Sequence, residues 1–186
     1  MTPQLIRPRR FSDARGWFSE TYNRAVFHDL GITDEFVQDN HSRSLTRGTL
    51  RGLHCQTPPH AQAKLVRCIR GAIFDVAVDL RRASPTFGQW VGATLTAERG
   101  EQLYVPVGFG HGFLTLSDET EVLYKCSDLY APECEAGVSW DDMQIAVDWP
   151  LDGAQPHLSE KDRNLPPLRA FTADFPYDGI PLAPLD

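Results

Sequence analysis

Side chains that can exchange protons or bind polar ligands are concentrated between Gln38 and Lys64. This stretch contains His54, whose imidazole titrates near neutral pH and can therefore accept a proton under cellular conditions. A phenol at Tyr124 and a carboxylate at Asp162 follow farther along the chain. Together these residue types predict general acid–base chemistry at one site, provided that the fold brings them together.

The elements that must position these side chains are short strands. The 14 glycines and 14 prolines are spread along the chain and divide it into short apolar segments, which is typical of an all-β sandwich or barrel. Residues 72–80 are the clearest strand, because apolar side chains occupy every second position. Only residues 24–30 and 159–164 favour short helices. Further strands are expected at residues 36–41, 64–70, 88–95, 102–106, 112–116, 121–127 and 137–140.

One local pattern indicates the kind of β fold. Gly100, Pro106, Gly108 and His111 are spaced as in the second sequence motif of cupins, although Thr115 stands where that motif usually has Asn. Pro106 and Gly108 predict a tight turn, after which His111 begins a returning strand and points into the barrel. The pattern therefore predicts a double-stranded β-helix, the cupin jelly roll.

The chain closely resembles the dTDP-4-dehydrorhamnose 3,5-epimerase family, in the same order and at the same spacing from about residue 5 to residue 165. Each motif alone is weak evidence, and the series together is strong. The matching segments are DARGWF (13–18), FVQDNHS (36–42), LRGLH (50–54), KLVR (64–67), FDVAVDLR (74–81), SPTFG (84–88), PVGF (106–109), HGF (111–113), LYK (123–125) and LSEKD (158–162).

The resemblance implies an isomerase that converts dTDP-4-dehydro-6-deoxy-D-glucose to dTDP-4-dehydro-L-rhamnose. Inversion beside a ketone needs a base that removes a carbon-bound proton and an acid that returns one from the opposite face of the sugar. By resemblance, His54 is the base, Asp162 orients it, and Tyr124 is the acid. Lys64 would stabilise the enolate at the C4 oxygen. This scheme requires no metal and no redox cofactor.

The resemblance also implies the residues that bind the substrate. Arg51 and His111 would complete the polar lining around the sugar, and Tyr130 is similar to the aromatic residue that stacks on thymine. Part of the family's nucleotide site comes from a partner subunit, so a homodimer is expected. The remaining positions that match the nucleotide and phosphate site are Arg15, Glu20, Gln38, Asn40, Glu135 and Lys161.

Arg51 and His54 present a geometric difficulty. They are three residues apart, so the alternation of a regular strand would place them on opposite faces. A bulge at Gly52 would restore a shared face.

Three other functions compete with the double epimerase. A relative that inverts only C3 or only C5 would use the same catalytic pair, so the sequence hardly separates the two. A metal-dependent cupin, such as a dioxygenase, needs several His and carboxylate ligands, yet His54 is followed by Cys55 and Gln56 rather than by a second His. A non-catalytic sugar-nucleotide binding module would not need both His54 and Tyr124.

Composition limits the class of protein. The chain has 18 basic and 25 acidic residues and a net charge of -7, which argues against binding to nucleic acid. No apolar run reaches the roughly 18 residues of a membrane span, and residues 1–7 lack a signal peptide pattern, so a cytoplasmic enzyme is expected.

The length suits a single domain over residues 1–186, with an irregular tail from about residue 165. Four cysteines without Cys-x-x-Cys spacing are expected to be free thiols: Cys55, Cys68, Cys126 and Cys134.

Overall fold

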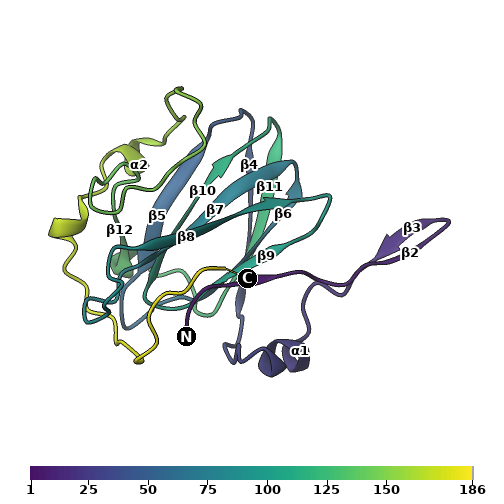
Figure 1. Ribbon diagram of the computed structural model, residues 1–186, viewed down its shortest axis with the longest axis horizontal. Coiled ribbons are helices and arrows are strands. Elements are labelled where there is room, and N and C mark those ends of the chain that lie inside the picture. The colour runs from purple at the N-terminus through teal and green to yellow at the C-terminus, as the bar shows by residue number, and fades with distance from the viewer. Residues whose placement is uncertain (186) are drawn as a thin grey trace.

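Two antiparallel sheets of five strands each face one another and form a β sandwich (Figure 1). The computed structural model describes residues 1–185. The architecture is the cupin jelly roll that the sequence predicts. The first sheet has the order β1 (Gln4–Ile6), β9 (Gln102–Val105), β6 (Lys64–Arg70), β11 (Thr120–Cys126) and β4 (Gln38–Ser44). The second sheet has the order β12 (Glu135–Gly137), β5 (Leu50–Gln56), β10 (Phe109–Thr115), β7 (Ala72–Asp79) and β8 (Trp90–Thr96).

Apolar side chains from both sheets fill the space between them. Val66, Leu103 and Val122 of the first sheet pack with Ile73 and Phe109 of the second. Burying a side chain of this size stabilises a fold by about 1.5–3 kcal/mol. This shared core therefore fixes the position of one sheet relative to the other.

The second sheet is buried on its outer face as well. Phe74, Val76 and Val78 of β7 turn outward, as the predicted alternation requires, and pack against the segment that follows β12. Trp149 and Phe175 of that segment belong to the same cluster, and Phe175 is only 1% exposed. The C-terminal tail is irregular apart from a short 3-10 turn. It nevertheless packs as part of the core.

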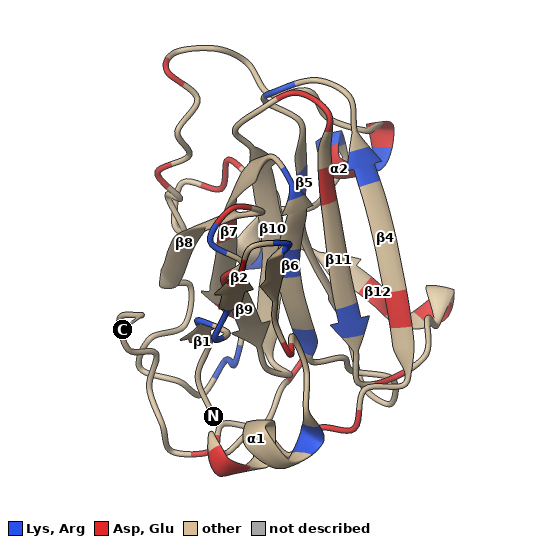
Figure 2. Ribbon diagram, turned by 90° about the vertical axis from the view of Figure 1, so that its right-hand side faces the viewer, with Lys and Arg blue, Asp and Glu red and all other residues tan. Residues whose placement is uncertain are grey.

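The outer face of the first sheet is partly covered by the helix α1 (Arg24–Asp29). The side chain of Asn23 caps this helix by accepting a hydrogen bond from the Ala25 amide. Phe27 of α1 packs against Leu65 and Tyr104 of the sheet. The uncovered part of this face is polar, and Figure 2 shows charged residues along β4 and β11. His41–Glu121 and Asp39–Lys125 are ion pairs between these two strands, and Arg43 of β4 pairs with Glu119, just before β11.

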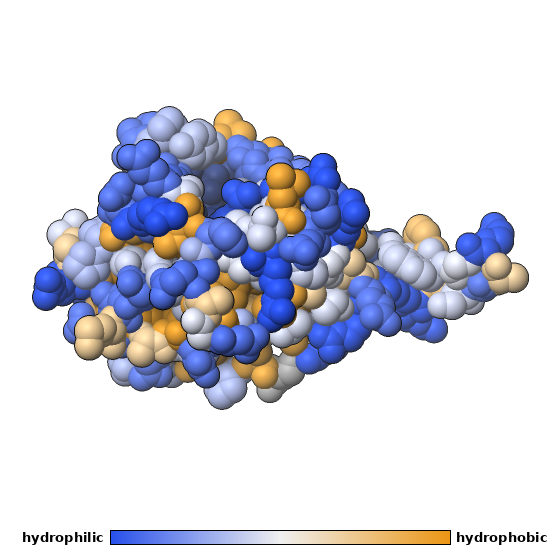
Figure 3. Space-filling view, turned by 90° about the horizontal axis from the view of Figure 1, so that it is seen from above, coloured by the Kyte–Doolittle hydropathy of each residue, from blue (hydrophilic) through white to orange (hydrophobic). Residues whose placement is uncertain are grey.

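A hairpin of β2 (Phe11–Asp13) and β3 (Gly16–Phe18) projects from the body as a separate arm (Figures 1 and 3). It carries large apolar side chains that remain in contact with solvent, since Phe11, Trp17 and Phe18 are 50%, 58% and 69% exposed. An isolated two-stranded hairpin has little stability of its own. The arm is thus an apolar surface that the same chain leaves uncovered.

Most predicted elements are confirmed, including the helices α1 and α2 (Glu160–Arg163). The strand expected at residues 137–140 is wrong, because β12 ends at Gly137. The strand β5 was not expected from the sequence, because Gly52 interrupts its alternation. Among the described residues, no helix is both long and apolar enough to cross a membrane.

Candidate active site

A cavity of about 290 Å³ opens between the two sheets and contains most of the predicted site residues. Strands of both sheets and the helix α2 contribute to its wall. Its lining consists of Ser42, Arg51, His54, Lys64, His111, Phe113, Tyr124, Glu135, Ser159, Lys161 and Asp162.

The strand β5 brings Arg51 and His54 to this cavity through a bulge. His54 is paired with His111 on β10, but Arg51 is paired with Phe113, so three steps along β5 match two along β10. Gly52 has φ +122°, and a Cβ atom there would lie 2.6 Å from the Gly112 Cα. Glycine is therefore required at position 52, and the predicted bulge is confirmed.

His54 is held by a buried carboxylate. Its Nε2 lies 2.8 Å from Asp162 Oδ1, although the ring N–H is not well aligned with that oxygen. Asp162 also accepts hydrogen bonds from the Gly52 amide and from the hydroxyl of Ser159, the residue that caps α2. Burial by itself would raise the pKa of Asp162, but the contact with His54 and the hydrogen bonds from Ser159 and Gly52 outweigh it and lower that pKa to about 2. A carboxylate that stays ionised can orient the imidazole and stabilise its protonated form.

Tyr124 and Lys64 face the cavity from the first sheet. In the pairing of β11 with β6, Tyr124 is opposite Val66 and Cys126 is opposite Lys64, so the two side chains are diagonal neighbours on the inner face. Burial raises the pKa of the Tyr124 phenol, so this group keeps its proton at neutral pH. Burial lowers the pKa of the Lys64 ammonium, and nearby acidic groups, Asp75 among them, oppose that shift.

His111 and Arg51 are also held by neighbours. His111 Nε2 lies 2.8 Å from Oδ1 of the fully buried Asp75, which was not expected as a site residue. The sequence signal for Asp75 is a carboxylate in the middle of the apolar strand β7, on the inward face that it shares with Asp79. Arg51 donates to the Ser44 hydroxyl and to the Arg43 carbonyl on β4.

Residues predicted for the nucleotide form a hydrogen-bonded line beside the cavity. Gln38 accepts from the Tyr130 amide at 2.9 Å and donates to Asn40 at 3.1 Å. The Tyr130 hydroxyl lies 3.4 Å from Glu135, which in turn pairs with Lys161. Tyr130 is 56% exposed, so its ring is available to a ligand.

Arg15 and Glu20 are not brought to this cavity by their own chain. Arg15 lies at the turn of the projecting hairpin, where it pairs with Asp13. Glu20 follows the hairpin and accepts a hydrogen bond from Asn23, next to α1. Neither residue lines the cavity that contains His54.

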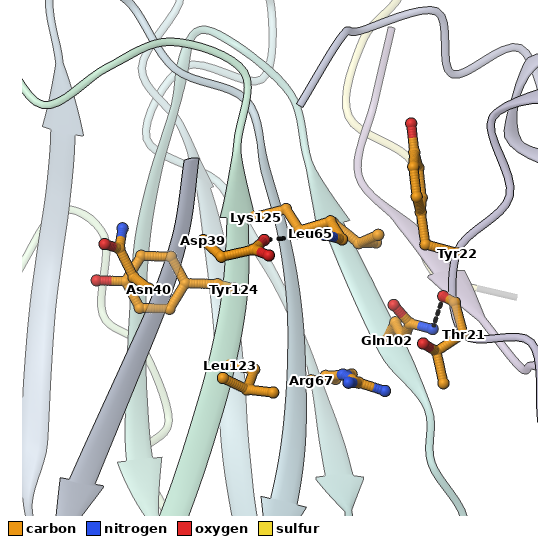
Figure 4. Close-up of a pocket in the computed structure, with 10 residues that line it drawn as sticks. All are labelled: Thr21, Tyr22, Asp39, Asn40, Leu65, Arg67, Gln102, Leu123, Tyr124 and Lys125. Atoms are coloured by element: carbon orange, nitrogen blue, oxygen red, sulfur yellow. Dashed lines mark hydrogen bonds and ion pairs between the residues drawn. The ribbon is translucent and has the colours of Figure 1, made fainter. Parts of the chain in front are cut away.

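A second cavity, of about 280 Å³, lies on the outer face of the first sheet (Figure 4). Tyr124 and Asn40 reach its edge, and Leu65 and Arg67 line it from β6. It contains no histidine, and its carboxylate, Asp39, is paired with Lys125. Acid–base chemistry therefore fits the cavity between the sheets and not this one.

The described residues contain no group of three or more His, Cys, Asp or Glu side chains arranged to hold a metal ion. The four cysteines are free, as predicted from their spacing, and all are buried: Cys55, Cys68, Cys126 and Cys134.

Comparison with known proteins identifies the family. A sequence profile of dTDP-4-dehydrorhamnose 3,5-epimerases matches residues 3–170. The dTDP-4-dehydrorhamnose 3,5-epimerase of Pseudomonas aeruginosa is 56% identical over 160 residues, which cover 86% of this chain and 87% of the relative. A Legionella pneumophila epimerase solved with dTDP-4-keto-L-rhamnose is 46% identical, with a TM-score of 0.87 over 93% of each chain. A 3'-monoepimerase of Streptomyces bikiniensis, solved with dTDP-quinovose, is 38% identical, with a TM-score of 0.82 over 90% of this chain and 84% of the other. The cavity with its His54–Asp162 pair, the jelly roll and these matches lead to one conclusion: the chain belongs to the dTDP-4-dehydrorhamnose 3,5-epimerase family.

Proposed function

We propose that this protein converts dTDP-4-dehydro-6-deoxy-D-glucose to dTDP-4-dehydro-L-rhamnose by inverting C3 and C5. One observation carries the proposal: the proton acceptor and the proton donor enter one cavity from different sheets. His54 comes from β5 of the second sheet and Tyr124 from β11 of the first. A sugar ring between them would meet a base on one side and an acid on the other, as inversion requires.

Each catalytic group has a step that suits its surroundings. His54, oriented by Asp162, removes the proton from the carbon beside the C4 ketone, and the resulting imidazolium is stabilised by the ionised carboxylate. The electron pair moves onto the C4 oxygen, where the Lys64 ammonium stabilises the enolate. The Tyr124 phenol then gives its proton to the opposite face of the same carbon and is reprotonated from solvent. His54 releases its proton to solvent, and repetition of the same steps at the second carbon completes the conversion.

Similarity to relatives favours inversion at both centres over inversion at one. The double epimerase of P. aeruginosa is 56% identical to this chain, whereas the 3'-monoepimerase of S. bikiniensis is 38% identical.

The nucleotide end of the substrate is assigned to the exposed residues beside the cavity. Tyr130 would stack on thymine, and Lys161 would neutralise a phosphate after leaving Glu135. Gln38 and Asn40 would hold the Tyr130 loop and contact the base.

A homodimer would explain the position of Arg15 and Glu20. Both belong to the region of the projecting hairpin, whose exposed aromatic residues need a partner surface. In a symmetric dimer, each hairpin would reach across and place Arg15 and Glu20 at the nucleotide site of the partner subunit.

We place the protein in the cytoplasm, which suits its four free, buried thiols. No nucleic acid or membrane partner is proposed, since the chain carries a net charge of -7.

The proposal is tested by incubating the protein with dTDP-4-keto-6-deoxyglucose in deuterated water and recording NMR spectra of the product. The double epimerase must introduce deuterium at C3 and C5 and yield the L-rhamno configuration. Deuterium and inversion at a single carbon would instead identify a monoepimerase.

A further inference from the structure

The cavity contains a second histidine–carboxylate pair, which the proposed mechanism does not use. His111 on β10 and Asp75 on β7 lie on adjacent strands, and Nε2 of the histidine is 2.8 Å from Oδ1 of the aspartate. The Asp75 side chain is 0% exposed and that of His111 is 7% exposed. Burying a carboxylate is costly unless a cation or a hydrogen-bond donor accompanies it, so this pair needs a physical explanation.

The charges around Asp75 indicate the protonation state of His111. The second carboxylate oxygen, Oδ2, is buried and has no hydrogen-bond partner. Burial raises the pKa of the Asp75 carboxyl, and the hydrogen bond from His111 and the nearby ammonium of Lys64 oppose that effect. A buried cluster is least costly when its net charge is close to zero. One carboxylate and one ammonium, on Asp75 and Lys64, already reach that balance, so a neutral His111 fits best.

The position of the proton on a neutral His111 then follows from its partner. A neutral imidazole has one N–H donor and one acceptor nitrogen, whereas an ionised carboxylate only accepts. The contact with Asp75 therefore requires the proton on Nε2, which leaves a lone pair on Nδ1. Nδ1 makes no hydrogen bond to any described residue and is not among the buried unpartnered atoms. It is thus open to the cavity that His111 lines.

We propose that Asp75 is a positioning residue that holds His111 in the Nε2–H tautomer, so that Nδ1 accepts a hydrogen bond from a hydroxyl group of the sugar. The inference rests on the proposed function, because that hydroxyl belongs to the substrate. Lys64 has only donors and cannot take this role. The two side chains then divide the sugar between them: Lys64 faces the C4 oxygen, and His111 recognises a neighbouring hydroxyl.

The tautomer can be measured in the free protein, independently of catalysis. In ¹⁵N-labelled protein at neutral pH, two-bond ¹H–¹⁵N spectra distinguish a protonated ring nitrogen from an unprotonated one, and a His111→Gln variant assigns the signals. We expect His111 to have a proton on Nε2 and none on Nδ1. A proton on Nδ1, alone or together with one on Nε2, would overturn the proposal. Because no substrate is present, failure of the proposed epimerase activity leaves this result intact.

The variant Asp75→Asn tests the role of the carboxylate. An amide can donate to Nε2, which allows the proton of His111 to move to Nδ1 and turns the acceptor into a donor. We expect a changed tautomer and a decrease in kcat/KM of about 10- to 100-fold, the scale of one buried hydrogen bond left unmade. An unchanged tautomer with unchanged kcat/KM would contradict the proposal.

Asp79→Asn is the matched control on the same face of the same strand. Asp79 is also buried, but it binds Arg81, Ser84 and Thr86 and does not line the cavity. This variant should be less stable, yet the tautomer of His111 and the kcat/KM of the folded protein should not change. A loss of kcat/KM equal to that of Asp75→Asn would show a general packing effect and overturn the assignment.

Discussion

Asp162 Oδ1 is shared by two groups of the strand β5, the His54 imidazole at 2.8 Å and the backbone N–H of Gly52 at 3.1 Å. The same oxygen therefore fixes both the proposed base and the bulge that turns this base toward the cavity. A change at either residue is expected to affect the other.

The bulge is tested by Gly52→Ala. The new methyl group would meet the Gly112 backbone at 2.6 Å and would also occupy a φ of +122° that side chains rarely adopt. We expect a loss of stability on the order of 2–5 kcal/mol and a reduced kcat/KM, because the backbone at His54 must shift. Thermal or denaturant unfolding measures the first effect. The control is Gly153→Ala. Gly153 has φ +80°, but a Cβ atom there would meet no atom within 4 Å. Only the free-energy cost of the unfavourable backbone angle therefore remains, so the loss of stability should be smaller and activity should be kept.

The pH dependence of stability reports on Asp162. Its pKa is about 2 in the folded protein and 3.8 in an unperturbed side chain, so the folded state favours the ionised form. The resulting stabilisation is complete above about pH 4 and disappears as the pH falls through about 2. We expect it to be on the order of 2 kcal/mol. Urea unfolding of Asp162→Asn should therefore show a flatter decline between these pH values than the unchanged protein, and equal slopes would contradict the assigned pKa.

Tyr124→Phe should separate proton removal from inversion. The His54–Asp162 pair is intact in this variant, so solvent deuterium should still enter the substrate, returned by His54 on the face from which the proton was removed. Product formation should decrease by about 10²- to 10⁴-fold, the usual contribution of a positioned acid. NMR in deuterated water follows both processes. Epimerisation at the original rate would show that the proton comes from another group.

His54→Asn should abolish both deuterium exchange and epimerisation while keeping substrate affinity. Asparagine is close in size but cannot accept a proton at neutral pH, so a loss of about 10²- to 10⁴-fold in kcat is expected. Calorimetry with dTDP checks that binding persists. Retained turnover would support the alternative of a different base, and lost binding would indicate a structural role for His54.

The proposed partner-subunit role of Arg15 predicts complementation between two inactive variants. His54→Ala and Arg15→Ala should each have low activity alone. If Arg15 acts in the site of the partner subunit, a mixed dimer contains one intact site and one site with both defects. Random mixing after denaturation and refolding should therefore restore about a quarter of full activity, since half the dimers are mixed and half their sites are intact. No recovery would place Arg15 in its own subunit's site or outside any site.

The sequence predicts the strand pattern best where alternation is regular. The strand β7 is identified from its apolar positions, and its two faces pack as expected. Alternation fails for β5, because Gly52 changes the face on which the following residues lie. The strand that carries His54 was therefore missed as an element although His54 itself was identified by resemblance.

The candidate site shows the same limits. His54, Tyr124, Lys64 and Asp162 converge as the resemblance implies. Asp75 was overlooked because a carboxylate inside an apolar strand gives no local sign of its partner, which lies 36 residues away. The proposed role of Arg15 requires a contact with a partner subunit, and no pattern within one sequence specifies that geometry.

The placement of His54 and Tyr124 on different sheets has a consequence for the interior of the sandwich. The gap between these two side chains depends on the thickness of the apolar layer formed by residues such as Val122 and Leu103, which do not line the cavity. Cores are packed closely, so a change of a few methyl groups there is expected to shift neighbouring side chains and the spacing between the two sheets. The volume of the core side chains can thus set the distance between His54 and Tyr124. Substitutions in the core could adapt that distance to sugars with bulkier or smaller substituents.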